Sequence, residues 1–336
     1  MYHKNNMYHK NNIFKKSIIN CLVLFALVFC TSCEKDIEDF ESSIIHGLTF
    51  NNYPKTDCST SALPLNTLIA CELLGIKNRW EYNITSGEWG IVPRFGYDNS
   101  RKFNEVVSST TTHHSFVNLI DKNVELILVA RKMSEDEKTL ADAAGISLIE
   151  TPIARDAFVF IVHPDNPIKS LTIKQIQDIY TAKIRNWKDV GGNDATIKPY
   201  VRNANSGSQE LMESLVMQGL DMSGYFEVYN EFEYTMYSMT GAFRAVSGDV
   251  NINSICYTIH YYKEHIIRKK STKSIGIEGI FPDRETIGNN TYPFVEPVYA
   301  VIRSDLDKSS MAYKIYEWLQ TEAGKKVVVK SGYLAF

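Results

Sequence analysis

The sequence lacks several patterns that identify common classes of protein. It contains no GxxxxGK[ST] loop for the phosphates of a nucleotide and no GxSxG motif around a nucleophilic serine. Positive charge is not in excess, because 36 Lys and Arg stand against 39 Asp and Glu, a formal net charge of −3. Nucleic acid binding normally requires clustered Lys and Arg. These absences argue against a nucleotide-hydrolysing subunit, a serine hydrolase of this type and a nucleic acid binder.

Long apolar runs are also scarce, and the one that is present lies near the N-terminus. Residues 18–29 follow Lys15 and Lys16 and precede a Cys-Thr-Ser-Cys segment that ends at Cys33. The run is shorter than the ~20 residues that a membrane-spanning helix needs. The order of charged, apolar and small residues is instead typical of a secretory signal. We therefore expect residues 1–33 to direct export.

The end of this signal predicts how the protein is attached to a membrane. Ser32 directly before Cys33 resembles the lipobox of bacterial lipoproteins, in which the cysteine is lipidated and becomes the first mature residue. Cys30 replaces the usual Leu or Val, as in the looser lipoboxes of Bacteroidetes. We expect a lipid anchor at Cys33, for example in the outer membrane, with the protein facing the periplasm or the cell surface. An ordinary cleaved signal is the alternative, and the acidic residues 34–44 are predicted to be a solvated tether.

Cysteine and histidine give little support for a disulfide framework or a metal site. Of the six cysteines, Cys58, Cys71 and Cys256 remain after the predicted signal. An odd number argues against a disulfide framework, and isolated buried thiols are expected. Only His113 and His114 lie close together, and neighbours on a helix point in different directions. We expect no bound metal and no cofactor.

The rest of the chain alternates β-branched runs with amphipathic segments. Strands are predicted at residues 124–129, 158–162, 252–257 and 298–302, and helices at residues 135–144, 173–180, 211–218 and 309–322. Such alternation predicts an α/β fold with mostly parallel sheets. A chain of 336 residues is long enough for two domains, and no long linker divides it. We therefore expect two lobes joined by crossing strands.

Three runs of hydroxyl side chains precede amphipathic helices. They lie at residues 59–61, at residues 108–112, and at Ser206 and Ser208 around Gly207. A helix start exposes unpaired N–H groups and a partial positive charge, so it binds anions readily. Glycine lets an oxyanion approach the backbone closely. A helix cap explains any one run, but each run holds more hydroxyls than a cap requires, which predicts an oxyanion site.

Several further segments, taken in order, resemble one family. These segments are residues 53–61, 152–159, 186–192, Arg202 with 206–208, 241–246, 292–293 and 332–333. Together they resemble the phosphate-binding solute receptors of ABC transporters, the PstS-like group of type II periplasmic binding proteins. The resemblance covers residues 53–336. It implies a two-lobed α/β fold with mixed, mostly parallel sheets, a hinge between the lobes and no enzymatic activity.

The resemblance also implies the lobe boundaries and the binding residues. Lobe 1 is expected to comprise residues 45–155 and 275–336, and lobe 2 residues 156–274. One tetrahedral anion is expected between them, held by Ser59, Thr60, Ser61, Thr111, Thr112, Arg202, Ser206, Gly207 and Ser208. Arg202 would supply a bidentate charged fork. A salt bridge between the lobes is the alternative role of Arg202.

One departure from the family concerns the choice of ligand. Phosphate receptors carry an aspartate after the strand that precedes the helix at residues 135–144, and it accepts the proton of hydrogen phosphate. This chain has Val-Ala-Arg-Lys there, at residues 129–132. We therefore expect Arg131 to be a further ligand-binding residue, which favours a more highly charged or proton-free anion, or a larger ligand such as an organophosphate. Asp57 or Asp156 is an alternative proton acceptor.

The leading hypothesis is a monomeric binding protein that delivers phosphate or a related oxyanion to an ABC transporter. Because the chain has neither a nucleotide loop nor a spanning segment, energy coupling and passage would reside in partner permease and ATPase subunits. Closure of two lobes around the ligand is the expected mechanism. Two alternatives stay open: a secreted hydrolase of phosphate esters, and a surface receptor or adhesion module whose ligand has changed.

Overall fold

The structure is a computed structural model that describes residues 45–95, 97–268 and 270–336. The chain divides into residues 1–46 and residues 47–336, and the second unit holds the fold. The predicted signal, its Cys33 and the predicted tether lie outside the described residues. Within the described part, no helix is both long enough and apolar enough to cross a membrane.

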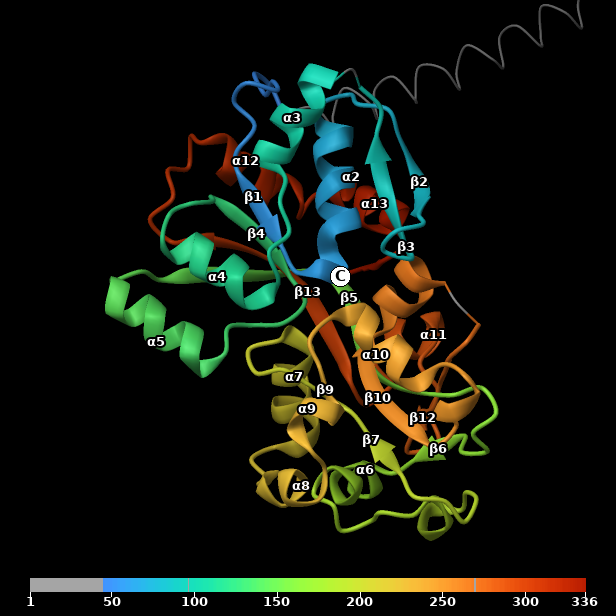
Figure 1. Cartoon of the computed structure of the whole chain (residues 1–336). Helices are drawn as coiled ribbons and strands as arrows, with labels where there is room; N and C mark the ends of the chain where they lie inside the picture. Colours follow the sequence, from blue (N-terminus) through green and yellow to red (C-terminus); the bar gives the residue numbers. More distant parts are fainter. Residues whose placement is uncertain (1–44, 96, 269) are drawn as a thin grey trace, which may run out of the picture. The chain divides into compact units, whose positions relative to one another are not determined.

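One mixed sheet runs through the fold (Figure 1). Its strands follow the order β1-β4-β13-β5-β10-β7, and β11 and β14 also pair with β5. The strands are β1 (Thr56–Cys58), β4 (Leu126–Val129), β5 (Leu148–Val162), β7 (Lys198–Pro199), β10 (Ser254–Ile259), β11 (Lys273–Ser274), β13 (Val295–Arg303) and β14 (Leu334–Ala335). The predicted mixed α/β fold is confirmed.

Antiparallel pairing dominates this sheet, which corrects the expectation of mostly parallel sheets. β13 is antiparallel to both β4 and β5, and β10 is antiparallel to β5. The parallel pairs in the sheet are β1 with β4 and β7 with β10. The reason lies in the long strands β5 and β13, which run past each other in opposite directions and occupy the centre of the sheet.

β5 connects two parts of the sheet. Its residues 148–157 pair with β13, whereas residues 158–162 pair with β10. Residues 158–162 are fully buried apolar side chains, as expected for a strand covered on both faces. The division into two lobes stays a prediction. The predicted boundary places residues from 275 onward in lobe 1. However, β12 (Gly276–Ile277) pairs with β6 (Ser170–Leu171), and this pairing favours a second crossing between the lobes at β13 instead.

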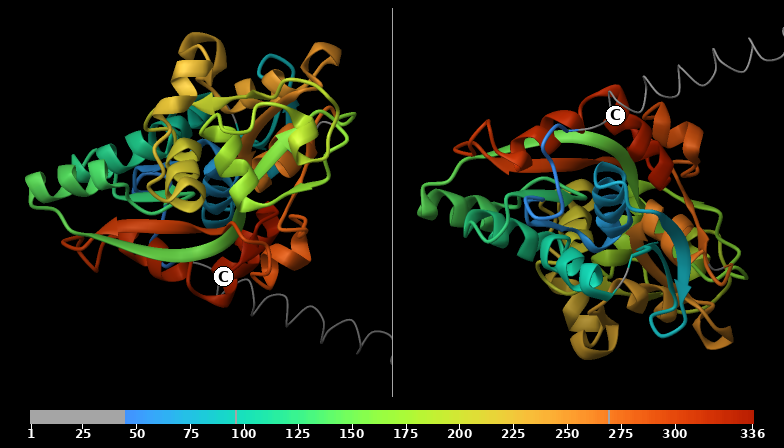
Figure 2. Two further views of the ribbon diagram at one scale, coloured as in Figure 1. Left: turned by 90° about the horizontal axis from the view of Figure 1, so that it is seen from below. Right: turned by 90° about the horizontal axis from the view of Figure 1, so that it is seen from above.

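Helices cover both faces of the long strands. α4 (Thr112–Ile120) and α12 (Met311–Trp318) both pack on β4 and β13, and Figure 2 shows them on opposite sides of the strands. The other helices are α2 (Leu63–Leu73), α3 (Tyr97–Val106), α5 (Glu135–Ala144), α6 (Ile173–Tyr180), α7 (Gly207–Leu211), α8 (Ser223–Val228), α9 (Glu231–Tyr234), α10 (Met239–Val246), α11 (Arg284–Gly288) and α13 (Glu322–Ser331).

Two predicted helices match the structure to the residue. α5 and α6 both begin with a capping box, formed by Ser134 with Glu137 and by Thr172 with Gln175. Gly145 adopts a left-handed conformation (φ 66°) that ends α5. Start and stop signals of this kind lie within a few residues of the helix, so the sequence contains them directly.

Two other predicted helices have different bounds. Residues 211–218 were expected to form one helix, but α7 ends at Leu211 and a π-helical turn, η3 (Met212–Met217), follows. Residues 309–322 contain α12 and the start of α13, separated at Thr321, whose hydroxyl accepts the N–H of Gly324. A new N-cap therefore interrupts the apolar periodicity that predicted a single helix.

Asp156 is a buried carboxylate in the crossing strand β5. Its Oδ1 accepts the backbone N–H groups of Ala157 (2.8 Å) and Tyr261 (3.0 Å). Its Oδ2 has no hydrogen-bond partner among the described residues. Burial raises the pKa of this carboxyl to about 7, because the charged form loses its hydration and two backbone donors compensate only in part.

We expect Asp156→Asn to remove a pH dependence of stability. The native carboxyl keeps its proton up to about pH 7, whereas an unfolded chain loses it near 3.8. Its contribution is therefore fully present below pH 3.8 and is lost as the pH rises through 7. Urea unfolding of both proteins should show that the unfolding free energy of the variant rises relative to that of wild type between pH 3.8 and pH 7. The gain should be on the order of a few kcal/mol, at about 1.4 kcal/mol for each pKa unit.

The comparison with wild type isolates Asp156 from an opposing group. Burial lowers the pKa of His260 to about 4, so His260 makes stability rise with pH between its native and unfolded values. That contribution is common to both proteins and cancels in the difference. A difference between variant and wild type that stays constant from pH 4 to pH 8 would contradict the prediction.

Candidate functional site

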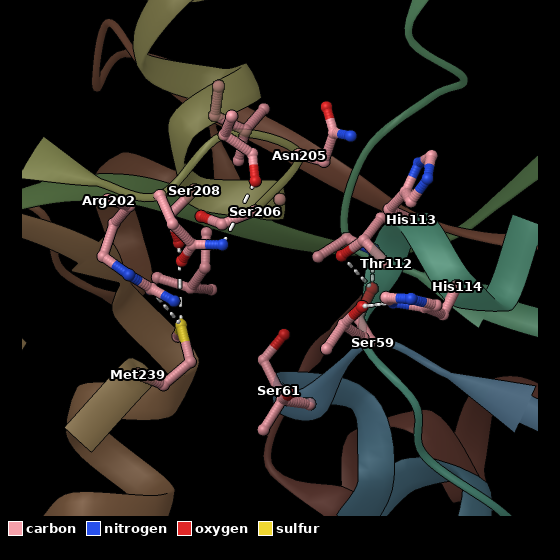
Figure 3. Close-up of a pocket in the computed structure, with 18 of the residues that line it drawn as sticks. Ser59, Ser61, Thr112, His113, His114, Arg202, Asn205, Ser206, Ser208 and Met239 are labelled. Carbon is pink, nitrogen blue, oxygen red and sulfur yellow. Dashed lines mark hydrogen bonds between the residues drawn. The ribbon is translucent and has the colours of Figure 1, made fainter. Parts of the chain in front are cut away.

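A cavity of ≈ 150 Å³ lies where the three hydroxyl-rich helix starts meet (Figure 3). Nine of the ten predicted ligand-binding residues line it: Ser59, Thr60, Ser61, Thr111, Thr112, Arg202, Ser206, Gly207 and Ser208. A water molecule needs roughly 10–15 Å³ by the same measure, and drug-sized ligands need roughly 300–1,000 Å³. The cavity therefore has the size for a small polyatomic ion.

Ser59 ties three segments together at the base of the cavity. It follows β1, and its backbone N–H bonds the carbonyl of Leu128 at 2.9 Å. Its Oγ accepts the N–H of Ala130 at 3.0 Å and is hydrogen-bonded to Thr112 Oγ1 at 2.8 Å. These contacts hold the 3₁₀ turn η1 (Thr60–Ala62), which leads into α2, beside the start of α4.

The helix starts around the cavity leave their N–H groups unpaired. Neither Ser59 nor Thr111 caps its helix with a side-chain hydrogen bond, whereas Ser206 does cap α7. In the described part of the chain, no hydrogen bond is found for the backbone N–H groups of Thr60, Ser61, Thr112, His113, Gly207 and Ser208. Capping alone thus does not account for two of the three hydroxyl runs. Unpaired N–H groups at helix starts favour an anion.

Thr111 carries backbone strain at this position. Its φ of 101° lies in the region that favours glycine, which is unusual for a β-branched residue. Such a conformation costs roughly 1–3 kcal/mol and persists only when the surroundings impose it. The Thr111 carbonyl accepts the Ser115 hydroxyl at 2.7 Å and so helps to fix the turn. Strained backbone at a cavity wall is typical of binding sites.

Arg202 supplies the only Lys or Arg side chain among the described residues that line the cavity. Its Nε donates to the Met236 carbonyl at 2.7 Å, and its Nη1 lies 3.1 Å from Met239 Sδ. Its backbone N–H bonds both Gln209 Oε1 and the Tyr257 hydroxyl. The guanidinium is thus positioned by neutral groups.

The charge of Arg202 has no counter-ion in the described part of the chain. The residue is 7% exposed, and no carboxylate pairs with it there. The predicted alternative, a salt bridge between lobes, is therefore not found among these residues. Burial lowers the pKa of this guanidinium. A buried charge without a partner is costly, and a bound anion would supply the missing partner.

Gly207 brings the two sides of the cavity into contact. A Cβ atom at this position would lie 2.5 Å from Thr112 Oγ1, closer than any real contact. Glycine is therefore required for the close approach of α7 to the start of α4. The sequence predicted a glycine role in admitting an anion to the backbone, and the structure adds this packing role.

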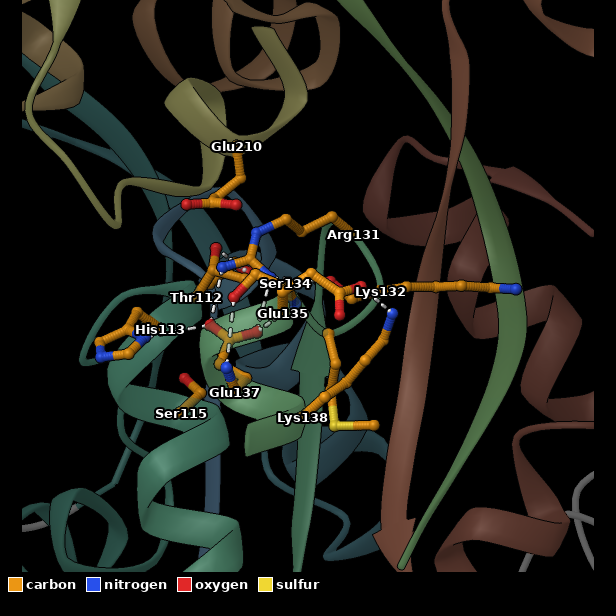
Figure 4. Close-up of polar contacts among 12 residues, drawn as sticks. Thr112, His113, Ser115, Arg131, Lys132, Ser134, Glu135, Glu137, Lys138 and Glu210 are labelled. Atoms are coloured by element: carbon orange, nitrogen blue, oxygen red, sulfur yellow. Dashed lines mark hydrogen bonds and ion pairs between the residues drawn. The ribbon is translucent and has the colours of Figure 1, made fainter. Parts of the chain in front are cut away.

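Arg131 is not among the described residues that line the cavity, and Figure 4 shows its side chain beside Glu137. Its Nη1 and Nη2 donate to Glu137 Oε2 and Oε1, both at 2.7 Å. The ion pair is buried, with Arg131 4% exposed and Glu137 0% exposed. Glu137 also lies 3.1 Å from His113 Nδ1, and His113 does line the cavity. The structure therefore places Arg131 behind the site instead of among the other nine predicted residues.

No Asp or Glu lines the cavity in the described part of the chain. Asp57 is buried beneath it and accepts the N–H groups of Cys58 (2.8 Å) and Thr110 (2.9 Å). Asp156 lies in β5 and belongs to a different cavity. Neither predicted alternative proton acceptor lines the site, so the cavity presents hydrogen-bond donors without a carboxylate.

Two kinds of lining residue were not predicted as ligand-binding residues from the sequence. His113 and His114 were considered only as metal ligands, yet both line the cavity and follow the strained Thr111. Asn205 and Met239 also contribute, and no local pattern marks them. The described residues contain no group of three or more His, Cys, Asp or Glu side chains that could hold a metal ion.

The side chains around the cavity do not form a hydrolytic triad. Thr111 Oγ1 and His114 Nδ1 lie 3.1 Å apart, which is the geometry of a hydroxyl beside a base. No carboxylate among the described residues orients His114, although such a third group normally completes the arrangement. The arrangement is suited to holding a tetrahedral oxyanion.

Comparisons with known proteins find a family model and several relatives. A family model of the PBP superfamily domain matches residues 94–321. The phosphate-binding protein PstS of Borreliella burgdorferi is 26% identical over 191 residues, 55% of this chain and 65% of that protein. PstS of Staphylococcus epidermidis is 26% identical over 211 residues, 61% of this chain and 62% of that protein. The chain thus spans slightly less than two thirds of the length of these relatives.

A solved structure shows the same fold. An ABC-type phosphate transport receptor from Vibrio cholerae superposes with a TM-score of 0.56 at 22% sequence identity. The alignment covers 83% of this chain and 99% of that chain. At this identity the likeness concerns the arrangement of strands and helices.

Proposed function

Because the chain belongs to the family of the PBP superfamily domain, we propose that it captures phosphate or a similar oxyanion in the cavity at Arg202. The observation that carries this proposal is the buried guanidinium without a counter-ion. Unpaired N–H groups and hydroxyls from three helix starts surround the same space. An oxyanion would satisfy the charge and the donors together.

The energetics support a micromolar site. A dissociation constant of 1 μM corresponds to about 8 kcal/mol. Hydrogen bonds to charged groups contribute roughly 1.5–3 kcal/mol each, and association itself costs several kcal/mol. The donors that line the cavity therefore provide enough interactions even after that cost.

The biological setting is part of the proposal. Export, a lipid anchor at Cys33 and a position facing the periplasm or the cell surface rest on the first 33 residues. The names of the relatives, phosphate-binding proteins and a transport receptor, support delivery to an ABC permease with its ATPase. We propose that the protein works as a monomer and closes two lobes around the anion.

Calorimetric titration of the purified, exhaustively dialysed full chain tests the function. We expect phosphate to bind at one site with a dissociation constant of about 1 μM. Because donors but no carboxylate line the described cavity, we expect sulfate to compete within roughly tenfold. Absence of binding to either anion at millimolar concentration would refute the function. A preference for phosphate above roughly a hundredfold would contradict the role given to the missing carboxylate.

A further inference from the structure

We call the cavity at Arg202 the anion cavity. A second cavity adjoins it, and Thr60 lines both. We call the second cavity the side cavity, and its volume is ≈ 410 Å³. Three elements surround it: α2, the hairpin formed by β2 (Asn78–Asn83) and β3 (Glu88–Pro93), and the π-helical turn η5 (Tyr262–Ile267). This volume is within the roughly 300–1,000 Å³ of sites for small organic molecules. The side cavity therefore has room for a group that the anion cavity cannot hold.

The two cavities share a lining residue just before α2. Thr60 lines both, and Leu63, Pro64 and Thr67 line the side cavity. Leu63 and Thr67 lie four positions apart in α2 and therefore on the same face, and Thr60 precedes them in the 3₁₀ turn η1. A ligand whose anionic group contacts residues 59–61 can thus extend along the first turns of α2 into the side cavity.

The walls of the side cavity differ chemically from those of the anion cavity. Tyr82, Trp89 and Ile266 provide aromatic and apolar surface. Glu88 provides a carboxylate, and the second carboxylate, that of Glu81, is paired with Arg79. The Tyr82 and Trp89 rings lie 5.6 Å apart, and Tyr82 is 45% exposed. Carboxylates accept hydrogen bonds and repel anions. The side cavity is therefore suited to an organic group that donates hydrogen bonds through hydroxyl or amino groups.

Glu88 is held in place for such a role. The Tyr262 hydroxyl donates to Glu88 Oε1, and burial raises the pKa of Tyr262, so it stays protonated. Its bond occupies one acceptor position of a carboxylate that offers about four. No hydrogen bond is found for Glu88 Oε2 among the described residues, which leaves an acceptor for a ligand.

No carboxylate is found among the described residues of the anion cavity, where the unpaired Oδ1 of Asn203 is a neutral acceptor, and this lining favours the same class of ligand. Inorganic phosphate at neutral pH carries a P–OH proton that needs an acceptor. A phosphate monoester has a second pKa near 6, so at pH 7.5 it presents three acceptor oxygens and no such proton. Its fourth substituent is the ester oxygen, which leads to the organic group. Donors around the phosphoryl group and a side cavity beyond it match this arrangement.

We propose that the two cavities together bind a phosphate monoester whose organic group donates hydrogen bonds. The phosphoryl group occupies the anion cavity at Arg202, and the organic group occupies the side cavity beside Tyr82 and Glu88. This inference rests on the proposed function, because it uses the same anion cavity. Polyol esters and amino-alcohol esters share the required chemistry, and the experiment separates them.

The test is calorimetric titration of the full chain with four compounds: inorganic phosphate, glycerol 3-phosphate, ethanolamine phosphate and phenyl phosphate. We expect at least one of the two hydrogen-bonding esters to bind 10-fold or more tightly than inorganic phosphate, at about 1.4 kcal/mol for each tenfold step. Phenyl phosphate can contact the aromatic walls but has no donor for Glu88, so it should bind less tightly than the better of these two esters. Esters that bind no more tightly than phosphate would overturn the inference and leave the function standing. If no compound binds, the function itself fails.

Variants in the hairpin of β2 and β3 test where the organic group of the ester binds. We expect Tyr82→Ala to remove the ester's advantage and leave the affinity for inorganic phosphate unchanged. Ile84→Ala, in the exposed turn of the same hairpin and outside the side cavity, is the matched control and should change neither. Glu88→Gln should weaken ethanolamine phosphate more than glycerol 3-phosphate if the natural group is an amine. A Tyr82→Ala variant that binds all four compounds like wild type would overturn the placement.

Discussion

Arg202→Ala should weaken phosphate binding by about 100-fold or more. The change removes the only Lys or Arg side chain among the described residues of the cavity, together with a fork that can make two charge-assisted bonds. Two such bonds are worth about 3 kcal/mol or more, and each 1.4 kcal/mol is tenfold in affinity. Arg202→Lys keeps the charge without the planar fork, so its affinity should be intermediate. Calorimetric titration at constant ionic strength measures both.

Stability of the same variant separates loss of binding from loss of structure. Because the Arg202 charge is buried without a counter-ion in the described part, removing it should leave the unliganded protein at least as stable in urea. Arg101→Ala is a charge-matched control on exposed α3 and should affect neither affinity nor stability. Unchanged phosphate affinity in Arg202→Ala would show that the anion binds elsewhere.

Glu137→Ala should produce the largest loss of stability, about 3–5 kcal/mol. Glu137 is fully buried and compensates the charge of Arg131 through two hydrogen bonds of 2.7 Å. It also accepts the N–H of Ser134 at 2.8 Å, which completes the capping box of α5. Removing one member of a buried pair leaves an uncompensated charge. The midpoint and slope of a urea transition give the change in unfolding free energy.

Two controls show whether the cause is the unpaired charge. Glu135→Ala removes a carboxylate from the same helix, but its pair with Lys138 is exposed, so the loss of stability should be small. The double variant Arg131→Met with Glu137→Leu removes both charges and should recover much of the lost stability. A double variant as unstable as Glu137→Ala would mean that packing or the helix cap dominates.

The buried ion pair of Arg131 and Glu137 illustrates where prediction from the sequence was limited. Arg131 was predicted to contact the ligand because it occupies the place of an expected acceptor. Ser134 and Glu137 already have the spacing of a capping box, which predicts the start of α5. The sequence does not reveal that the Glu137 carboxylate also pairs with Arg131 and with His113. That choice depends on how β4, α4 and α5 pack.

The three hydroxyl-rich runs were predicted to lie around one site, and they do line one cavity, whereas their contact with a ligand stays a prediction. The cavity is lined by every predicted binding residue except Arg131, because each run precedes a helix and local spacing defines a helix start. Their convergence required distant contacts, such as the bonds from Ser59 to Thr112 and to Ala130. Whether the hydroxyls capped their helices or left N–H groups unpaired was also decided by these contacts.

Arg202 was predicted from the family resemblance. By itself, the sequence determined the α/β class, the bounds of α5 and α6, and the hydroxyl-rich runs that line the cavity. These features depend on residues within about four positions of each other, where capping and periodicity act. Only the tertiary structure decided the antiparallel pairing of β5 and β13, the absence of a carboxylate around Arg202 in the described part, and the side cavity at Thr60. Those features arise from contacts between segments far apart in the chain, whose energies no local pattern contains.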